Sequence, residues 1–275
     1  MELYEIIERV RENAPLVQCI TNFVTVNDCA NILLASGASP TMAMDIREVE
    51  ESVEKVQALV CNLGAIEHVA SMILAGKRAN QLKIPVVLDP VAAGGTALRR
   101  QASKELLKNV HFSVIRGNAS EIRGLLSGDS HGSGVDVSKL DVITPENISS
   151  SVEMIRSLAR QTKSVIAVSG AIDVVSDETH TWLIHNGCRT MARITGSGCM
   201  LTTLMGAFCG SVPEKPFEAA CAAMAVMGIC GELAEQRRLK YETGNATFRT
   251  DLIDAVFNLT EKQFKEMIRY EIYEG

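Results

Sequence analysis

The sequence predicts an α/β fold of three layers, with a mostly parallel central sheet, helices on both of its faces and a late antiparallel hairpin. Two observations lead to this prediction. Short apolar runs that suit fully buried strands alternate with segments of helical periodicity, and no linker rich in Pro, Gly or Ser divides the chain. Such alternation is typical of right-handed βαβ crossovers, whose strands are parallel and covered by helices. We therefore expect residues 1–275 to form a single domain.

The individual elements follow from the spacing of apolar residues and from the glycines and prolines between them. Before Gly170 the expected elements are a helix that ends before Pro15, a helix over 27–34, strands over 58–63, 85–89, 112–116 and 164–168, and helices over 66–81, 97–108 and 145–161, with a short helix from Asn118. After Gly170, residues 174–175 and 181–184 are predicted to form antiparallel strands. From Gly198 onward the chain is predicted to be almost entirely helical, and the polar stretch 127–141 to be a mobile surface loop.

Composition and charge argue against several classes of protein. The net charge is -6 and no cluster of lysines and arginines stands out, so a nucleic-acid partner is not expected. The start of the chain lacks the pattern of a secretion signal, and the longest apolar stretch, 219–230, is too short to span a bilayer, so no membrane association is expected. The 8 cysteines are scattered and form no C-x-x-C pair, which is typical of reduced thiols in a cytoplasmic protein.

Polar side chains gather after three of the predicted strands. Asp89 ends one strand, Arg116 ends the next and is followed by Glu121, and Ser169 follows a third. One such residue on its own is often only part of a turn or a helix cap. Together they exceed what sheet geometry needs, and ligands bind at the carboxyl ends of parallel strands. Arg116 has a planar fork suited to phosphate oxygens, and the two carboxylates are hard ligands suited to a largely hydrated Mg²⁺.

The strongest feature of the sequence is the glycine-rich turn 195–199, which reads Thr-Gly-Ser-Gly-Cys and precedes an apolar helix. Its two glycines allow backbone angles that direct successive N–H groups to one point. The helix that follows adds its unpaired N–H groups and the positive end of its dipole. The turn is therefore predicted to bind an anion, with Cys199 at its centre, and a turn of small residues chosen for packing is the structural alternative.

Two chemical roles are open to Cys199. A helix N-terminus lowers the pKa of a thiol and favours the thiolate, which would suit a general base for a substrate hydroxyl or a covalent nucleophile. The second role, that of a Cys-His hydrolase, needs a histidine partner. His180 and His185 lie nearby in sequence, but we expect both to face solvent from the hairpin. The general base is therefore the favoured role.

Several short motifs together identify a family. They are 15–22 (PLVQCITN), 37–42 (GASPTM), 88–91 (LDPV), 115–121 (IRGNASE), 185–187 (HNG) and 195–199 (TGSGC). On these residues the chain resembles the hydroxyethylthiazole kinase family, which is ribokinase-like, over nearly its whole length. Most ribokinase-like kinases have Asp at the position of Cys199, whereas the thiazole kinases resemble this chain in having Cys.

The resemblance implies a ribokinase-like fold and a specific reaction. Members of the family transfer the γ-phosphoryl group of ATP to the primary hydroxyl of 4-methyl-5-(2-hydroxyethyl)thiazole in thiamine salvage, use Mg²⁺, and form homotrimers with active sites at subunit interfaces. By position, the resemblance assigns thiazole binding to Asn22, Met42 and Gly196, ATP binding to Arg116, Ser169, Gly196, Ser197 and Gly198, the metal to Asp89 and Glu121, and the catalytic role to Cys199.

Two other functions share most of these features. A ribokinase-like kinase for a hydroxymethylpyrimidine or a pyridoxal-like alcohol would keep all of them except Cys199 and the pocket of Asn22 and Met42. A catalytically silent ligand-binding or regulatory protein is the alternative from another class. The presence of Asp89, Arg116 and Glu121 together with the glycine-rich turn argues against it.

Overall fold

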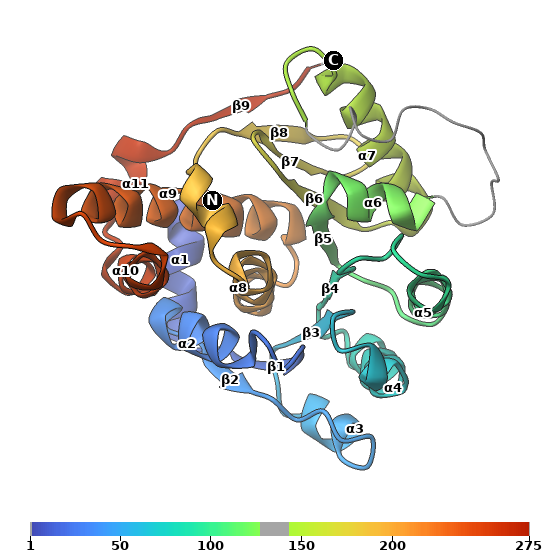
Figure 1. Cartoon of the computed structure of the whole chain (residues 1–275). Helices are drawn as coiled ribbons and strands as arrows, with labels where there is room; N and C mark the ends of the chain where they lie inside the picture. Colours follow the sequence, from blue (N-terminus) through green and yellow to red (C-terminus); the bar gives the residue numbers. More distant parts are fainter. Residues whose placement is uncertain (1, 127–142, 275) are drawn as a thin grey trace.

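The computed structural model of the protein describes residues 2–126 and 143–274. Within them one mixed sheet has the strand order β2-β1-β3-β4-β5-β6-β7-β8-β9 (Figure 1). Strands β1 to β6 are parallel to one another, and β7, β8 and β9 each run antiparallel to the strand before them. The strands are β1 (Leu16–Ile20), β2 (Ser39–Thr41), β3 (Ala58–Asn62), β4 (Val86–Asp89), β5 (Val114–Asn118), β6 (Val165–Ser169), β7 (Asp173–Ser176), β8 (Thr181–Ile184) and β9 (Tyr270–Ile272).

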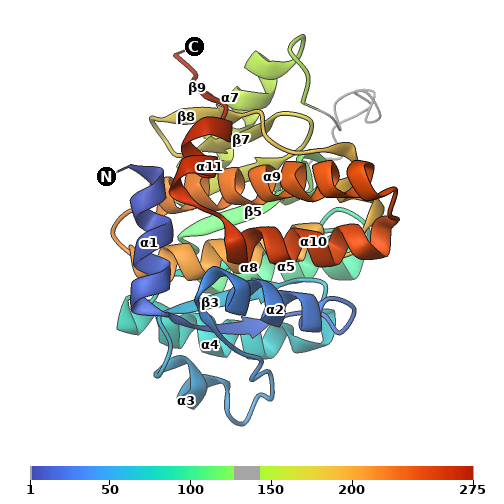
Figure 2. The same ribbon diagram turned by 90° about the vertical axis from the view of Figure 1, so that its left-hand side faces the viewer.

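Helices cover both faces of this sheet, which confirms the three-layer prediction (Figures 1 and 2). One face packs against α1 (Leu3–Asn13), α2 (Val26–Ser36), α8 (Ser197–Ser211), α9 (Pro216–Tyr241), α10 (Asn245–Asn258) and α11 (Glu261–Met267). The other packs against α3 (Val49–Val53), α4 (Val69–Leu82), α5 (Ala97–Asn109), α6 (Ala119–Leu126) and α7 (Ile148–Thr162). Short 3₁₀ helices occupy Ile66–His68 and Arg189–Arg193. Neighbouring strand residues alternate between the two cores, as the period of a strand requires: Val60 joins the first and Cys61 the second.

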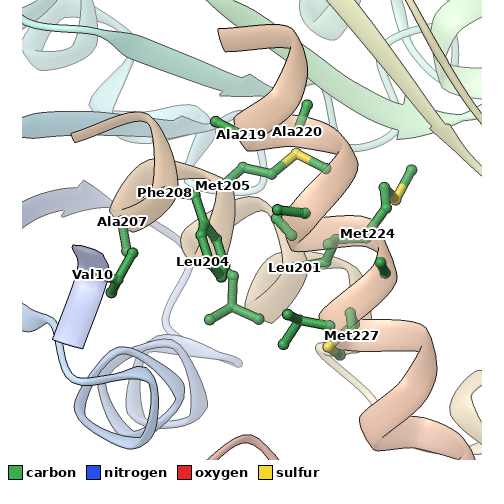
Figure 3. Close-up of a cluster of buried hydrophobic side chains, with 14 of the residues drawn as sticks. Val10, Leu201, Leu204, Met205, Ala207, Phe208, Ala219, Ala220, Met224 and Met227 are labelled. Carbon is green, nitrogen blue, oxygen red and sulfur yellow. The ribbon is translucent and has the colours of Figure 1, made fainter. Parts of the chain in front are cut away.

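Helix α8 lies in the middle of the larger core. It is apolar on all sides, as expected of a helix covered all round, and it packs against β1, β3 and β4 and against helices α1, α2 and α9. Figure 3 shows Leu201, Met205 and Phe208 of α8 in the same buried cluster as Met224 and Met227 of α9. Because the body of α8 is held this firmly, its first turn is fixed at the edge of the sheet.

Helix α9 is longer than the apolar stretch 219–230 that the sequence prediction considered. It has 26 residues and, among the residues that the structure describes, is the one helix long and apolar enough to cross a membrane. However, 78% of its most apolar window is buried inside the protein, as in the core helix of a folded domain.

The sequence prediction lacks β1, β2, β9 and α3. The apolar sequence pattern of strand β1 is interrupted by the polar residue Gln18, whose buried amide donates to the Ala43 carbonyl at 2.9 Å. The chain is almost entirely helical from Gly198 onward, as predicted, and the three-residue strand β9 is the exception. Its residues are exposed and show no apolar pattern, so pairing with β8 and the stacking of Tyr270 on Trp182, with ring centroids 4.6 Å apart, are what hold it. The predicted loop 127–141 lies outside the described residues.

Candidate active site

The carboxyl ends of the parallel strands meet the amino end of α8 at one edge of the sheet. Asn22 follows β1, Asn62 ends β3, Asp89 ends β4 and Ser169 ends β6. The strand register places Asn62 directly beside Asp89. Strand β1 lies between β2 and β3, so the order of strands reverses there. Open α/β sheets bind ligands at such a reversal, outside the carboxyl ends of the strands.

The glycine-rich turn has a conformation suited to binding an anion. The first backbone bond of α8 runs from the Met200 N–H to the Gly196 carbonyl at 2.8 Å. The N–H groups of residues 197–199 are therefore left without an acceptor inside the helix. Gly196 caps the helix with a φ of 87°, and a Cβ at that position would lie 2.8 Å from Cγ2 of Thr25. Both the backbone angle and the lack of space require glycine.

Arg116 lies next to this turn with its guanidinium buried. One terminal nitrogen, Nη2, donates to Ser169 Oγ, while Nε is buried with no hydrogen-bond partner in the described part of the chain. A Cβ on Gly198 would lie 2.5 Å from Nη1, so the turn and the guanidinium are in direct contact. Leaving a buried charged donor unpaired is costly, and an anion bound at the turn would satisfy it.

Cys199 is held by two side-chain amides. Its Sγ lies 3.3 Å from Asn62 Nδ2 and 3.5 Å from Asn22 Nδ2, and both nitrogens donate to it. Burial raises the pKa of the Cys199 thiol above its ordinary value, and the nearby Asp89 raises it further, while hydrogen bonds from Thr25 and the two amides oppose the rise. The prediction of a lowered pKa is therefore wrong, because the loss of water and the neighbouring carboxylate outweigh the helix N-terminus.

The histidines near Cys199 in sequence do not pair with it. His180 lies on the turn between β7 and β8 with 68% of its side chain exposed, as predicted, and its Nδ1 is 3.1 Å from Asp177 Oδ2. His185 follows β8, and its Nε2 is 3.6 Å from Glu271 Oε1. Within 2–126 and 143–274, no hydrogen bond of Cys199 involves a histidine, so the Cys-His pair of a hydrolase is not formed.

Asp89 is almost completely buried at the end of β4. Its Oδ2 accepts hydrogen bonds from Asn62 Nδ2 at 2.9 Å and from Thr202 Oγ1 at 3.0 Å. Burial raises the pKa of Asp89 from 3.8 to about 6, and Glu121 adds to the rise, whereas Arg116 and the bond from Thr202 oppose it. The two carboxylates predicted to organise a metal are therefore close enough to repel each other.

Glu121 joins two loops beside Asp89. Its Oε1 accepts the Ala92 N–H at 3.0 Å, and its Oε2 accepts the Asn118 N–H at 2.9 Å. Among residues 2–126 and 143–274, no group of three or more His, Cys, Asp or Glu side chains could hold a metal. A divalent cation here would have the two carboxylates near it and would complete its shell with water or ligand oxygens, as Mg²⁺ commonly does.

A cavity of about 530 Å³ opens beside Arg116, between the β6–β7 hairpin, the segment after β8, and helices α8 and α9. Its lining combines polar groups with methionines, and includes Ser169, Asp173, Asn186, Met191, Ser197, Gly198, Met224 and Met227. Burial raises the pKa of Asp173 to about 7, although the Gly170 N–H and Arg116 oppose the rise. Cys188 also lines this cavity and is only partly buried.

The predicted residues thus fall into two adjoining groups. Of the residues assigned to the nucleotide, Arg116, Ser169, Ser197 and Gly198 line the cavity, whereas Gly196, the N-cap of α8, does not. Those assigned to catalysis, substrate and metal, Asn22, Asp89 and Cys199, are joined through Asn62 in one hydrogen-bonded network. Met42 follows β2 at the same edge of the sheet, half-buried against the core around α8. The first turn of α8 connects the two groups.

Asn62, Thr202 and Asp173 are absent from the sequence prediction. Asn62 had a usable signal, since it is a polar residue at the end of an otherwise apolar strand, as Asp89 is. Thr202 has no such signal, because a threonine inside a helix usually bonds only to its own backbone. It does donate to the Gly198 carbonyl at 3.2 Å as well as to Asp89.

Comparisons with known proteins identify a family. The model of the hydroxyethylthiazole kinase family matches residues 7–262. A hydroxyethylthiazole kinase from Clostridium acetobutylicum is 45% identical over 98% of this chain and 100% of that protein, and one from Desulfovibrio desulfuricans is 43% identical over 92% of each. Among solved structures, the hydroxyethylthiazole kinase protein from Pyrococcus horikoshii OT3 is 34% identical, with a TM-score of 0.86 over 99% of both chains.

More distant structures share the fold alone. An ADP complex of Bacillus subtilis pyridoxal kinase is 14% identical, with a TM-score of 0.58 over 78% of this chain and 90% of that one. This confirms the predicted ribokinase-like architecture, and the match to the thiazole kinases is much closer. The family match spans most of the chain, and the relatives at above 40% identity cover nearly all of it. This chain belongs to the hydroxyethylthiazole kinase family.

Proposed function

We propose that this kinase transfers the γ-phosphoryl group of ATP to the primary hydroxyl of 4-methyl-5-(2-hydroxyethyl)thiazole, a step of thiamine salvage. Its membership of the family supports both the reaction and the substrate. The structural observation that supports it most is the position of the α8 N-terminus. Its free N–H groups lie between the cavity beside Arg116 and the network around Cys199, which is where a phosphoryl group would pass from one substrate to the other.

The cavity suits a nucleotide. Methionines 191, 224 and 227 offer an apolar wall to a base, and Ser197 and Gly198 lie at the end nearest the turn. Arg116 contributes an unpaired buried Nε there, a donor that a phosphate oxygen would satisfy. In this arrangement the charge on the polyphosphate meets a guanidinium fork and a helix N-terminus together.

Asp89 and Glu121 suit Mg²⁺. Both are hard oxygen ligands, and their mutual repulsion, which contributes to the raised pKa of Asp89, is what a divalent cation between them would relieve. When bound, the ion would neutralise phosphate charge. The chain's own contribution is to keep the two carboxylates in place, through Asn62 and Thr202 on one and two loop N–H groups on the other.

The chemistry depends on positioning and electrostatics, as in other phosphoryl transfers. The N–H groups of residues 197–199 would stabilise the charge that develops on the transferred group. Cys199 would lie beside the substrate hydroxyl and accept its proton. The Cys199 thiol is largely protonated at neutral pH because its pKa is raised. Two roles follow: a small population of thiolate accepts the proton of the substrate hydroxyl, or the sulfur only orients that hydroxyl.

Replacing Cys199 separates these roles. Cys199→Asp should remain active at pH 7, since a carboxylate is ionised there and the amides of Asn22 and Asn62 can donate to its oxygens. Cys199→Ala, which has neither base nor acceptor, should lose about 10²-fold in kcat. The comparison is made by steady-state turnover at saturating substrates. A folded Cys199→Asp variant that binds both substrates and is inactive would show that the base assignment is wrong.

Gly198→Ala tests the contact between the turn and the guanidinium. A methyl group there would lie 2.5 Å from Arg116 Nη1, so the guanidinium must move. We expect kcat/KM for ATP to fall about 10²-fold, the usual effect of a misplaced charge-stabilising donor. Gly244→Ala is the control, because nothing lies within 4 Å of its new Cβ. Equal kinetics in the two variants would exclude a close contact during catalysis.

The assembly and location of the enzyme are part of the same proposal. We propose a cytoplasmic homotrimer of single-domain subunits with active sites at their interfaces. The single sheet supports one domain. Phe23, 83% exposed, and Val24, 57% exposed, directly follow Asn22 and leave apolar surface at the edge of the active site, which supports an interface there. Sedimentation equilibrium of the purified protein measures its subunit number.

The direct test of function uses purified protein, Mg-ATP and the thiazole alcohol, with product followed by mass. We expect one phosphoryl group to be added to the alcohol and ADP to form in equal amount. Hydroxymethylpyrimidine and pyridoxal serve as competing acceptors in parallel reactions. Absence of phosphorylated thiazole at saturating substrates, or faster turnover of either competitor, would contradict the proposal.

A further inference from the structure

Asn62 lies at the centre of the site, where it contacts Cys199 as well as supporting Asp89. Its side chain is 1% exposed. Its Nδ2 donates to Asp89 Oδ2 at 2.9 Å and to Cys199 Sγ at 3.3 Å, and its Oδ1 accepts from the Gly64 N–H at 2.8 Å and from Asn22 Nδ2 at 3.3 Å. Both N–H bonds and both acceptor positions of the amide are therefore used.

The orientation of this amide is determined by groups that cannot exchange roles. The Gly64 N–H can only donate, so Oδ1 must face it, and the Asp89 carboxylate accepts, so Nδ2 must face that side. The same reasoning holds for Asn22, whose Oδ1 accepts the Thr25 N–H at 3.2 Å. Two amide N–H donors therefore point at the Cys199 sulfur.

We propose that Asn62 is a positioning residue that aims the Cys199 sulfur at the substrate hydroxyl and separates it from Asp89. The proposal rests on the proposed function, in which Cys199 lies beside that hydroxyl. A single amide nitrogen donates one hydrogen to each of the two groups. A negative charge on Cys199 or on Asp89 thus faces an N–H of Asn62 and does not directly face the other group. This lowers the repulsion between the sulfur and the carboxylate.

The backbone around Asn62 is built to hold this arrangement. A Cβ on Gly64 would lie 2.6 Å from Asn62 Oδ1 and 2.9 Å from Asn22 Nδ2. Any larger residue at 64 would therefore displace the two amides that hold the sulfur. Gly64→Ala thus changes the position of both amides and leaves their chemistry intact, whereas Asn62→Asp changes the chemistry and keeps the shape.

The test measures the reactivity of Cys199 separately from turnover. Asn62→Asp keeps the size of the side chain, but the one hydrogen of a protonated carboxyl group would bond to Asp89 and leave none for the sulfur. Iodoacetamide is added without substrates, and the alkylated cysteines are identified by peptide mass. We expect Cys199 in this variant to be alkylated about tenfold more slowly than in the wild type. We also expect kcat to fall about 10²-fold, with less than about a threefold change in the KM for ATP. Cys188 is the internal reference, because it is partly exposed and lies outside this network.

Asn80→Asp is the matched control. Its amide also pairs twice, with the His111 carbonyl at 2.9 Å and the His111 N–H at 2.8 Å, and it lies outside the site, on α4, where it contacts the loop before β5. Both readouts should stay at wild-type values in this variant. If Asn62→Asp does not fold, Gly64→Ala gives the same two readouts and should also lower the reactivity of Cys199 or kcat by at least about tenfold.

The outcomes separate this proposal from the proposed function. Unchanged alkylation of Cys199 together with unchanged kcat, or an equal slowing at Cys199 and Cys188, would overturn the positioning role. Slower alkylation at Cys199 alone, in a protein whose wild type does not phosphorylate the thiazole alcohol, would support the positioning role and refute the function. Loss of kcat with slower alkylation of Cys199 alone, in an active wild type, would support both.

Discussion

Asp89→Asn should lose about 10³-fold in turnover and yet make the folded protein more stable at pH 8. The first effect follows because the substitution removes a carboxylate proposed to organise the metal, whose charge stabilisation is worth several kcal/mol. The second follows from the pKa. The folded carboxyl group has a pKa raised from 3.8 to about 6, so it binds a proton more tightly than in the unfolded chain. The free energy of unfolding therefore falls as pH rises from about 4 to about 6 and stays lower above that range.

The size of the stability gain follows from this shift. Keeping the folded Asp89 carboxylate ionised at pH 8 costs about 3 kcal/mol, which asparagine avoids while its oxygen still accepts from Asn62 and Thr202. Thermal unfolding at pH 8 without Mg²⁺ should show a Tm higher by roughly 5–10 °C, and the gain should shrink as the pH approaches 4. Asp254→Asn, at an exposed position of α10, is the control. A Tm that drops equally at both pH values would contradict the burial cost.

Arg116→Lys should lower kcat/KM for ATP by about 10²–10³-fold although the positive charge is kept. The guanidinium bonds Ser169 with one nitrogen, touches Gly198 with another and keeps Nε free for a ligand. One ammonium group cannot occupy these three positions together. Steady-state kinetics with varied ATP and saturating thiazole alcohol measure the loss.

Arg78→Lys is the matched control for this substitution. Arg78 also uses its fork, with Nη2 2.7 Å from Glu54 Oε1, but on the surface of α4 away from the site. An exposed pair of this kind contributes little to stability, so both kinetics and Tm should stay close to wild type. Wild-type ATP kinetics in Arg116→Lys would mean that the fork is not needed for the nucleotide.

Much of the fold could be predicted because its strands are apolar on both faces. A buried strand such as β4 leaves polar residues only where it ends, and so Asp89 was recognisable as a candidate site residue from its position alone. Arg116 was recognised in the same way, although β5 runs two residues further, to Asn118. The same logic extends to Asn62, which was overlooked. Strand β9 could not be found in this way, because its exposed residues owe their conformation to β8, a partner distant in the sequence.

The electrostatics of the site were harder to predict than its location. The sequence shows that Cys199 opens a helix, and a helix N-terminus favours a thiolate. It does not show that the sulfur is largely buried or that Asp89, distant in sequence, lies close to it. These two effects reverse the direction of the pKa shift, and only the packing of α8 against β3 and β4 brings them about.

Strand β9 also bears on the order in which the enzyme is made. The N–H of Arg269, directly before it, donates to Asn186 Oδ1 at 2.8 Å, and its guanidinium donates to the His185 carbonyl at 2.9 Å and to Glu232 Oε1 at 2.5 Å. These bonds hold one wall of the cavity proposed to bind the nucleotide, which Asn186 lines. On the ribosome the parallel strands emerge long before Arg269 does, and early segments fold first. A nascent chain would thus have its parallel strands before this wall is in place, and the cavity would be complete only near the end of translation.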